Sequence, residues 1–355
     1  MVLEFFYEYG LFLAKAATLV AAILVVIGAA AQLAVRNKRD TEGHIEVHNL
    51  NETLENMSHA LREQVLDKAL YKQQLKQEQK QRKAEHKQKT KQIKKGEDIE
   101  KEHKKRLFVL DFDGDIKASD VEPLREEISS ILTLATERDE VLLRLESAGG
   151  MVHSYGLAAS QLQRIRDRKI PLVVSVDRVA ASGGYMMACI ADKLIAAPFA
   201  ILGSIGVVAQ IPNFHRLLKK NEIDVEVLTA GEYKRTLTMF GENTEKGRQK
   251  FIEDLEDTHE LFKEFVAEHR PQLDMNEVAN GDVWFGRRAL EKQLIDEIST
   301  SDEYLISACD EAEVFQVRYV EKKSISERLG TVVSGSLDRV LLTWWERLQR
   351  SRYFS

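Results

Sequence analysis

The sequence predicts an α/β fold in which most strands run parallel. From Arg106 onward, short apolar runs typical of buried strands alternate with segments whose apolar residues recur at helical spacing. Such alternation is typical of strand–helix–strand units, which place successive strands side by side in one sheet. The segment before Arg106 has a different composition, first apolar and then densely charged, so we expect the folded domain to begin at this residue.

The elements of this domain follow one another closely. Short runs rich in Val, Leu and Ile predict strands at residues 107–112, 141–146, 171–176, 193–196, 206–209 and 224–229. Apolar residues three and four positions apart predict helices at residues 121–134, 153–166, 183–191, 213–220 and 244–268. The last strand-like stretch ends near Tyr319, so the predicted domain covers residues 106–320.

An apolar segment at residues 16–35 contains no charged side chain. It is long enough to cross a bilayer as one helix, which needs about 20 residues. A cleaved signal peptide would place its positive charges before a shorter apolar core. Here the basic cluster of Arg36, Lys38 and Arg39 follows the segment. We therefore expect residues 1–39 to be an uncleaved membrane anchor.

Within residues 40–105, the stretch from Lys72 to Lys105 is dense in Lys, Gln and Glu and has almost no apolar side chains. Such a composition cannot bury a core, although it favours helix. We interpret the segment as a charged stalk, partly helical or disordered, and contact of its basic residues with anionic lipid is the alternative.

The C-terminal segment, residues 321–355, has an amphipathic pattern. One helix face would carry its large apolar residues, namely Leu337, Leu341, Trp344, Trp345 and Leu348. Such a helix either lies on a membrane surface or packs on the domain or another subunit. The sequence leaves these alternatives open.

Composition excludes several classes of function. The formal charge of −6 at pH 7 gives no indication of a nucleic-acid partner. The two cysteines, Cys189 and Cys309, give no disulfide framework, and Cys189 lies in an apolar helix where it is expected to be a core residue. No Cys/His cluster has metal-ligand spacing, so we expect neither a metal ion nor a cofactor.

Ser182 is the first candidate for chemistry. It lies between the predicted strand at 171–176 and the predicted helix at 183–191. The free N–H groups of a helix N-terminus favour negative charge, which develops when a serine attacks an acyl group. The alternative is a serine that only caps its helix beside a glycine turn.

Two further stretches end in residues suited to the same chemistry. Gly149 and Gly150 follow the strand at 141–146 and are able to turn an N–H toward a carbonyl oxygen. Lys234 follows the strand-like run at 225–230. A lysine acts as a general base only where burial or neighbouring charges lower its pKa, and the alternative is a solvated loop cation.

Four motifs in order resemble the signal peptide peptidase A (S49) family of serine peptidases, most closely its SohB branch. They are RLESAGGMV at 144–152, VDRVAASGGYMMA at 176–188, GSIGV at 203–207 and TAGEYKRT at 229–236. The anchor and the charged segment are similar too, so the resemblance covers nearly the whole chain. One departure is Ala148, where the family usually has proline.

The resemblance implies a fold and a set of site residues. The fold would be the ClpP/crotonase-like spiral of ββα units. Ser182 would be the nucleophile, Lys234 the general base, and Ser204 the residue that orients Lys234 by a hydrogen bond. The N–H of Gly183 and one N–H of the Gly149–Gly150 pair would form the oxyanion hole.

The resemblance also implies an activity and partners. The protein would be a single-pass serine endopeptidase of the bacterial inner membrane, hydrolysing membrane-associated or signal-peptide-like peptides through an acyl-enzyme. Relatives with one copy of the motifs are rings, so we expect a homo-oligomer of about eight subunits in which neighbouring chains share each site. The positive-inside rule places the domain in the cytoplasm, whereas the family's signal-peptide-degrading members act on the outer side.

Three alternatives stay open at this point. His153, which follows the glycine pair, is the rival base for Ser182. A catalytically silent membrane scaffold would use the same groove for binding, and a crotonase-like enzyme would act on an acyl-CoA thioester. The anchor and the presence of both Ser182 and Lys234 disfavour these two functions.

Overall fold

The computed structural model describes residues 43–94 and 104–321, with Tyr7, Gly10, Leu11, Lys15 and Thr18. Ile45–Tyr319 forms one compact unit, and Met1–His44 and Val320–Ser355 are assigned to a second. The predicted anchor helix at 16–35, apart from Thr18, and the predicted tail at 321–355, apart from Glu321, lie outside the described residues.

No helix in the described part of the chain combines the length and the apolar character needed to cross a membrane.

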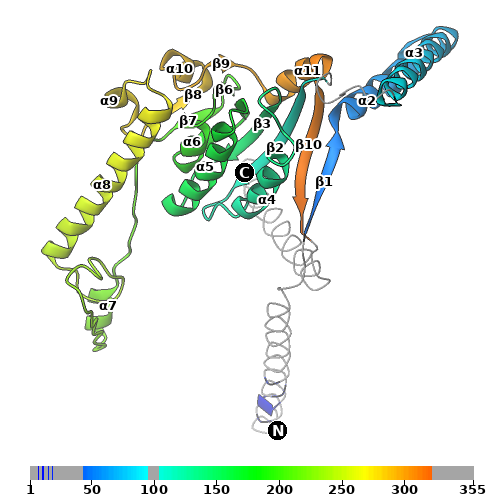
Figure 1. Ribbon diagram of the computed structural model, residues 1–355. Helices are drawn as coiled ribbons and strands as arrows, with labels where there is room; N and C mark the ends of the chain where they lie inside the picture. Colours follow the sequence, from blue (N-terminus) through cyan, green and yellow to red (C-terminus); the bar gives the residue numbers. More distant parts are fainter. Residues whose placement is uncertain are drawn as a thin grey trace, which may run out of the picture. The chain divides into compact units, whose positions relative to one another are not determined.

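A sheet of mainly parallel strands forms the centre of the larger unit (Figure 1). Its strands follow the order β1 (His44–Asn49), β10 (Glu313–Val320), β2 (Arg106–Gly114), β3 (Glu140–Ser147), β4 (Leu172–Val176), β6 (Lys193–Ala196) and β9 (Glu297–Ile298). All five residues of β4 are buried, as expected for a parallel strand covered on both faces. The α/β prediction is therefore confirmed, with strands at all four positions predicted before residue 200.

Three short strands continue the sheet beside the end of β3. They are β5 (Val179–Ala181), β7 (Ile201–Gly203) and β8 (Val283–Phe285). β5 pairs with β3 and with β7, both in parallel, and β7 pairs antiparallel with β8. This layer was not predicted because each strand has only three residues, too few to show a period. It matters because β5 ends directly before Ser182.

The two faces of the sheet are covered by different helices. Alternate residues of a strand point to opposite faces, so Phe108 and Leu110 of β2 join the core beneath three helices, while Leu107 and Val109 face the other side. The three helices are α4 (Val121–Ile131), α5 (Val152–Asp167) and α6 (Gly183–Ala188). The other side is covered by α11 (Ser301–Glu311) and the first residue of α2 (Leu50–Val65).

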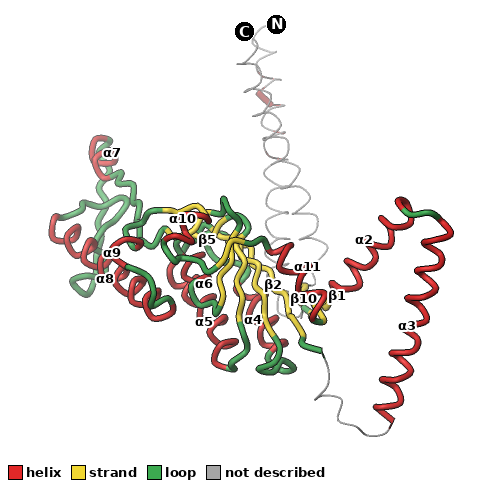
Figure 2. The backbone as a smooth tube through the Cα atoms, turned by 90° about the horizontal axis from the view of Figure 1, so that it is seen from above, coloured by secondary structure: helices red, strands yellow, loops and turns green. Residues whose placement is uncertain are grey.

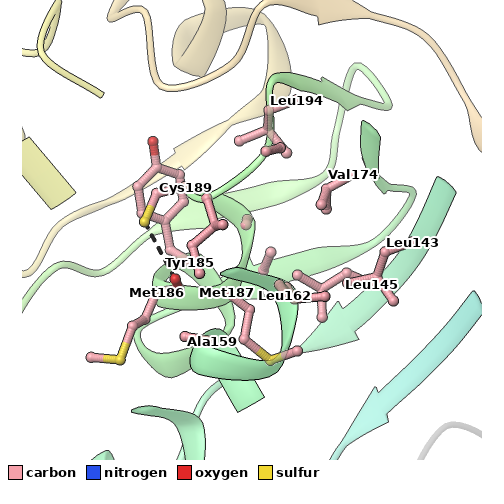
Figure 3. Packing of buried hydrophobic residues seen from close by; sticks show 14 of the residues in the cluster. Leu143, Leu145, Ala159, Leu162, Val174, Tyr185, Met186, Met187, Cys189 and Leu194 are labelled. Carbon is pink, nitrogen blue, oxygen red and sulfur yellow. Dashed lines mark hydrogen bonds between the residues drawn. The ribbon is translucent and has the colours of Figure 1, made fainter. Parts of the chain in front are cut away.

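Figure 3 shows how α5 and α6 pack on the sheet, with Ala159 and Leu162 beside Met187 and the strand residue Leu145. Cys189 lies in the same core, and its Sγ donates to the carbonyl oxygen of Met186 at 3.3 Å. Burial raises the pKa of this thiol to about 12. The prediction that Cys189 is a core residue is confirmed.

Part of the predicted stalk packs on the domain. β1 lies at the edge of the sheet, and the side chain of Asn51, in the first turn of α2, bonds the backbone of Cys309, Ala312 and Val314 at 2.7–3.0 Å. α3 (Lys68–Lys94) follows α2. Neither β1 nor this attachment was predicted, because the surrounding composition is so strongly polar.

The chain between β7 and α8 (Glu245–His269) runs away from the sheet. It carries α7 (His215–Lys220), and in Figures 1 and 2 this segment lies at the far end of α8 from α6. The strands predicted at 206–209 and 224–229 are wrong, since neither stretch pairs with another strand. Among the residues that the structure describes, no strand lies beside their β-branched residues, and Val208 is 91% exposed. Two short helices, α9 (Met275–Val278) and α10 (Gly286–Glu291), follow α8.

Glu127, on α4, is a buried carboxyl group that accepts a hydrogen bond from the Tyr319 N–H at 2.8 Å. Burial raises its pKa from 4.5 to about 7, and this hydrogen bond offsets the rise only in part. Between these two values the folded chain binds more protons than the unfolded chain, so the free energy of unfolding falls as the pH rises.

Replacing Glu127 with glutamine is expected to remove this pH dependence, which amounts to on the order of 3 kcal/mol. Glutamine keeps the oxygen that accepts from Tyr319. Urea unfolding of both proteins at about pH 5 and about pH 7.5 measures the effect. An equal change in stability between the two pH values in both proteins would show that Glu127 is not the group responsible.

Candidate active site

Ser182 stands at a strained turn between β5 and α6. Its backbone angles, φ 52° and ψ −119°, are those of the first central residue of a type II′ turn, where glycine is normally found. Its N–H donates to the Gly203 carbonyl oxygen at 2.8 Å, and its side chain does not cap α6. Such a conformation costs on the order of 1–3 kcal/mol and concentrates at functional sites. The alternative of a simple N-cap serine is therefore wrong.

Gly149 lies directly against this turn. A Cβ atom at Gly149 would stand 2.7 Å from the Gly183 nitrogen and 2.8 Å from the Ser182 Cβ, and its φ of +88° is strained for any other residue. The turn that carries Gly149 and Gly150 therefore lies directly against the Ser182 turn, backbone to backbone. The structure brings Ser182, Gly183, Gly149 and Gly150 together as the sequence predicted.

Two N–H groups at this contact are suited to an oxyanion. The first N–H groups of α6, beginning with Gly183, have no acceptor inside the helix. The Gly149 N–H donates to the Ser147 Oγ at 3.0 Å and is therefore occupied. Within the pair, this leaves the Gly150 N–H as the donor for a substrate oxygen.

A small cavity of about 80 Å³ opens beside Ser182. Its walls are mostly apolar, and they come from the glycine turns, the start of α5, α6, the segment after β7 and α8: Gly150, Val152, Ser182, Gly183, Met186, Gly206, Val207, Val208, Thr258 and Phe262. The contribution of Thr258 and Phe262 was not predicted, because the periodicity of α8 indicates its buried face but not what that face covers.

Ser204 follows β7, the strand beside β5. The register pairs Ala181 with Gly203, so Ser182 and Ser204 leave two neighbouring strands at the same level. Ser204 also has a positive φ, 51°, and its N–H donates to the Asp282 carbonyl oxygen at 2.6 Å. Two strained serines thus stand side by side at one edge of the sheet.

Lys234 lies apart from this group. Its neighbours Glu232 and Tyr233 contact the first turns of α8: Glu232 pairs with Lys246, and the Tyr233 ring lies 5.8 Å from the Lys250 ammonium. Lys234 itself is exposed and does not line the Ser182 cavity.

Contacts along α8 show how far the Lys234 segment lies from the Ser182 cavity. Lys246 and Lys250 mark the level of the Lys234 segment, whereas Thr258 and Phe262 reach the Ser182 cavity. At 1.5 Å per residue these contacts are about 12–24 Å apart along the helix. A lysine side chain with four methylene groups does not span that distance, so the single chain does not bring Lys234 to Ser182.

The histidines offer no base in contact with Ser182 within the described residues. His153 is exposed in the first turn of α5 and does not line the cavity. His259 comes closer, since it follows Thr258 on α8, but its Nε2 lies 3.2 Å from the Ile205 carbonyl oxygen. A carbonyl only accepts, so that nitrogen carries its hydrogen and cannot take another proton.

The strand-end carboxylates serve structure. Glu146 pairs with Arg178 at 3.2 Å. Asp177 accepts from the N–H and hydroxyl of Ser301 at 2.8 and 2.5 Å and fixes the start of α11.

One group of potential metal ligands occurs in the described ranges, away from Ser182. Glu55, His59 and Glu78 place ligand atoms within 4.8 Å of one another where α2 meets α3. Arg62 already donates to Glu78 at 3.0 Å, and His59 lies 3.4 Å from Glu55. We interpret the group as an ion-pair network that joins the two helices.

Comparison with known proteins gives matches to peptidases over most of the chain. The profile described as "Peptidase family S49 N-terminal" matches residues 4–162, and that of "Peptidase family S49" matches residues 164–315. A "Probable protease SohB" of Haemophilus influenzae is 54% identical over 322 residues, 91% of each chain. A protein of the same name from Buchnera aphidicola subsp. Acyrthosiphon pisum is 60% identical over 68% of this chain and 72% of its own. A "Putative signal peptide peptidase SppA" of Enterococcus faecium is 28% identical over 52% of this chain and 54% of its own.

Proposed function

The chain belongs to peptidase family S49, and we propose that this peptidase is a membrane-anchored serine endopeptidase with a Ser182–Lys234 dyad. The observation that carries the proposal is the strained Ser182 turn, held against Gly149 and Gly183 where a developing oxyanion would meet two N–H groups. A serine that only caps a helix would have no need of this conformation.

The proposed reaction has two steps. Lys234, neutral in the assembled site, takes the hydroxyl proton of Ser182 while Oγ attacks the peptide carbonyl carbon. The carbonyl oxygen becomes an oxyanion that accepts from the Gly183 and Gly150 N–H groups, each worth about 2.7–4 kcal/mol to the transition state. The C–N bond then breaks, the leaving amine takes the proton from Lys234, and an acyl-enzyme remains. Water, deprotonated by Lys234, then attacks the ester carbonyl carbon. The C–O bond to Ser182 breaks, Oγ takes the proton back from Lys234, and the acid is released.

We propose that Lys234 reaches Ser182 from a neighbouring subunit. Support comes from the separation of the two residues along α8 and from the exposure of Lys234 in the single chain. Desolvation lowers the pKa of a lysine, and packing between subunits would remove water from around Lys234. Ser204, next to Ser182 at the sheet edge, would accept a hydrogen bond from the incoming amine.

A closed ring of about eight subunits would cover the exposed apolar side chains of the segment between β7 and α8. This segment exposes large apolar side chains with little cover from its own chain; Leu228 is 89% exposed and Leu217 is 57% exposed. Isolated monomers rarely leave such surface uncovered. A head-to-tail interface that closes on itself would bury it and would deliver one lysine to each serine.

The proposed substrates are membrane-associated or signal-peptide-like peptides, and the residues at 16–35 would anchor the enzyme in the bacterial inner membrane. The cavity beside Ser182 supports this class, since Val152, Met186 and Phe262 favour an apolar substrate side chain and its volume of about 80 Å³ admits a small one. Short apolar residues abound in such peptides.

The test is covalent labelling with a fluorophosphonate probe, which reacts with activated serines. The full-length protein is expected to be labelled at Ser182, mapped by mass spectrometry, and Ser182→Ala is expected to lose the label. Ser160→Ala, at an exposed serine of α5 that does not line the cavity, serves as the control and should keep Ser182 as the labelled position. Failure of the assembled wild-type protein to react would favour a silent scaffold or an acyl-CoA enzyme instead.

A further inference from the structure

We propose that Tyr155 and Ser147 are positioning residues that hold the two halves of the oxyanion hole in register. The inference rests on the proposed function, because it concerns the same glycine turns. Neither residue touches the reacting atoms; each acts through the backbone that it holds.

Ser147 and Tyr155 hold the turn that carries Gly149 and Gly150. Ser147, 2% exposed, accepts from the Gly149 N–H at 3.0 Å. Its Oγ also lies 2.5 Å from the hydroxyl of Tyr155, which in turn donates to the Asp115 carbonyl oxygen at 2.8 Å. The Tyr155 hydroxyl has one hydrogen, so Ser147 donates to Tyr155 while accepting from Gly149.

These hydrogen bonds hold the Gly149–Gly150 turn in place. The Ser147 hydroxyl proton has one other acceptor nearby, the Gly114 carbonyl oxygen, at 3.4 Å. Tyr155 draws that proton toward itself, which leaves the lone pairs of Ser147 directed at Gly149. Burial raises the pKa of Tyr155, so its hydroxyl keeps its proton.

Tyr155 also supports the turn that carries Ser182 and Gly183. The ring of Tyr155 lies against Gly183, where an added Cβ would stand 2.4 Å from the ring Cγ. Gly183 carries the other oxyanion N–H, and a Cβ at Gly149 would stand 2.7 Å from its nitrogen. Tyr155 is fully buried and therefore positions both turns. Its hydroxyl holds the Gly149–Gly150 turn through Ser147, and its ring supports Gly183 in the Ser182 turn.

Loss of the hydroxyl should affect catalysis more than binding. An oxyanion hole works only when its donors are preorganised at hydrogen-bond distance from the developing charge. In Tyr155→Phe the ring still supports Gly183, but Ser147 is free to turn toward Gly114 and release Gly149. We expect kcat to fall about 10- to 100-fold with KM within about twofold, because removal of a whole donor costs 10²–10³.

The chain offers a matched control. Tyr185, on α6, is also fully buried, and its hydroxyl also donates one backbone bond, to the Leu294 carbonyl oxygen at 2.8 Å. Tyr185→Phe removes a comparable buried hydrogen bond without touching either glycine turn. It should lower the unfolding temperature about as much as Tyr155→Phe and leave kcat within about twofold of wild type.

The experiment measures kcat, KM, affinity for a peptide boronate and amide hydrogen exchange for wild type, Tyr155→Phe, Ser147→Ala and Tyr185→Phe as full-length proteins. The boronate forms a tetrahedral adduct on serine, so its affinity should fall with kcat in Tyr155→Phe and Ser147→Ala alone. Exchange at residues 148–151 should accelerate in the same two variants and stay unchanged in Tyr185→Phe.

Two outcomes overturn the proposal, and both differ from failure of the proposed function. If Tyr155→Phe and Tyr185→Phe lose equal activity, Tyr155 has only a structural role. If exchange at residues 148–151 is unchanged in Tyr155→Phe, the turn does not depend on its hydroxyl, whatever the activity. Failure of the proposed function would appear instead as a wild-type protein that neither hydrolyses peptides nor binds the boronate, and the exchange measurement would still decide the role of Tyr155.

Discussion

Replacing Lys234 with alanine is expected to lower the rate of peptide hydrolysis by a factor on the order of 10³ or more, and Ser182→Ala should do the same. Without the base, the Ser182 hydroxyl keeps its proton and is a weak nucleophile; without the serine, the base has nothing to activate. The double variant should lose little beyond either single variant, because residues that act as one unit are non-additive.

The measurement is kcat/KM on a fluorogenic apolar peptide with the full-length protein. Lys220→Ala is the matched control, since Lys220 is an exposed lysine at the end of α7 in the same segment and should keep wild-type activity. Full activity in Lys234→Ala would refute the dyad and return attention to His153 and His259.

The sequence was sufficient to predict the central strands of the sheet and the glycine turns, but not the short strands β5 and β7 beside Ser182. The runs that became β2, β3 and β4 are continuous apolar stretches, and strands covered on both faces require such stretches. The glycine turns were equally predictable, since Gly149 stands at a positive φ and touches another backbone, which few residues other than glycine tolerate.

The sequence failed where an element depends on a partner that is distant or external. Val225 and Val227 have the pattern of a strand, yet a strand needs a neighbour to bond, and the chain provides none there. β1 is the opposite case, a strand that exists but was not predicted. Its polar sequence does not indicate that it pairs with the edge of β10.

Tyr155 illustrates a third limit. The helical pattern of α5 indicates a core residue at this position, and Tyr155 is fully buried. Its hydroxyl matters only because Ser147, Asp115 and Gly183 meet it in space. No local pattern encodes that meeting, since it follows from the register of the strands on which these residues lie.

In the proposed ring, each active site takes Ser182 from one chain and Lys234 from the next. In an equal mixture of Ser182→Ala and Lys234→Ala subunits, a site is intact where a chain with its serine precedes a chain with its lysine. Random assembly in a closed head-to-tail ring gives that arrangement at about one interface in four.

Subunit mixing therefore tests the claim most directly. The two inactive variants, carrying different tags, are unfolded or dissociated together, reassembled, and shown to co-purify before hydrolysis is measured. Mixing Ser182→Ala with the double variant is the control and should stay inactive. Recovery of about a quarter of wild-type activity is the result predicted here; no recovery in mixtures that co-assemble would contradict it and place both residues of each site within one chain.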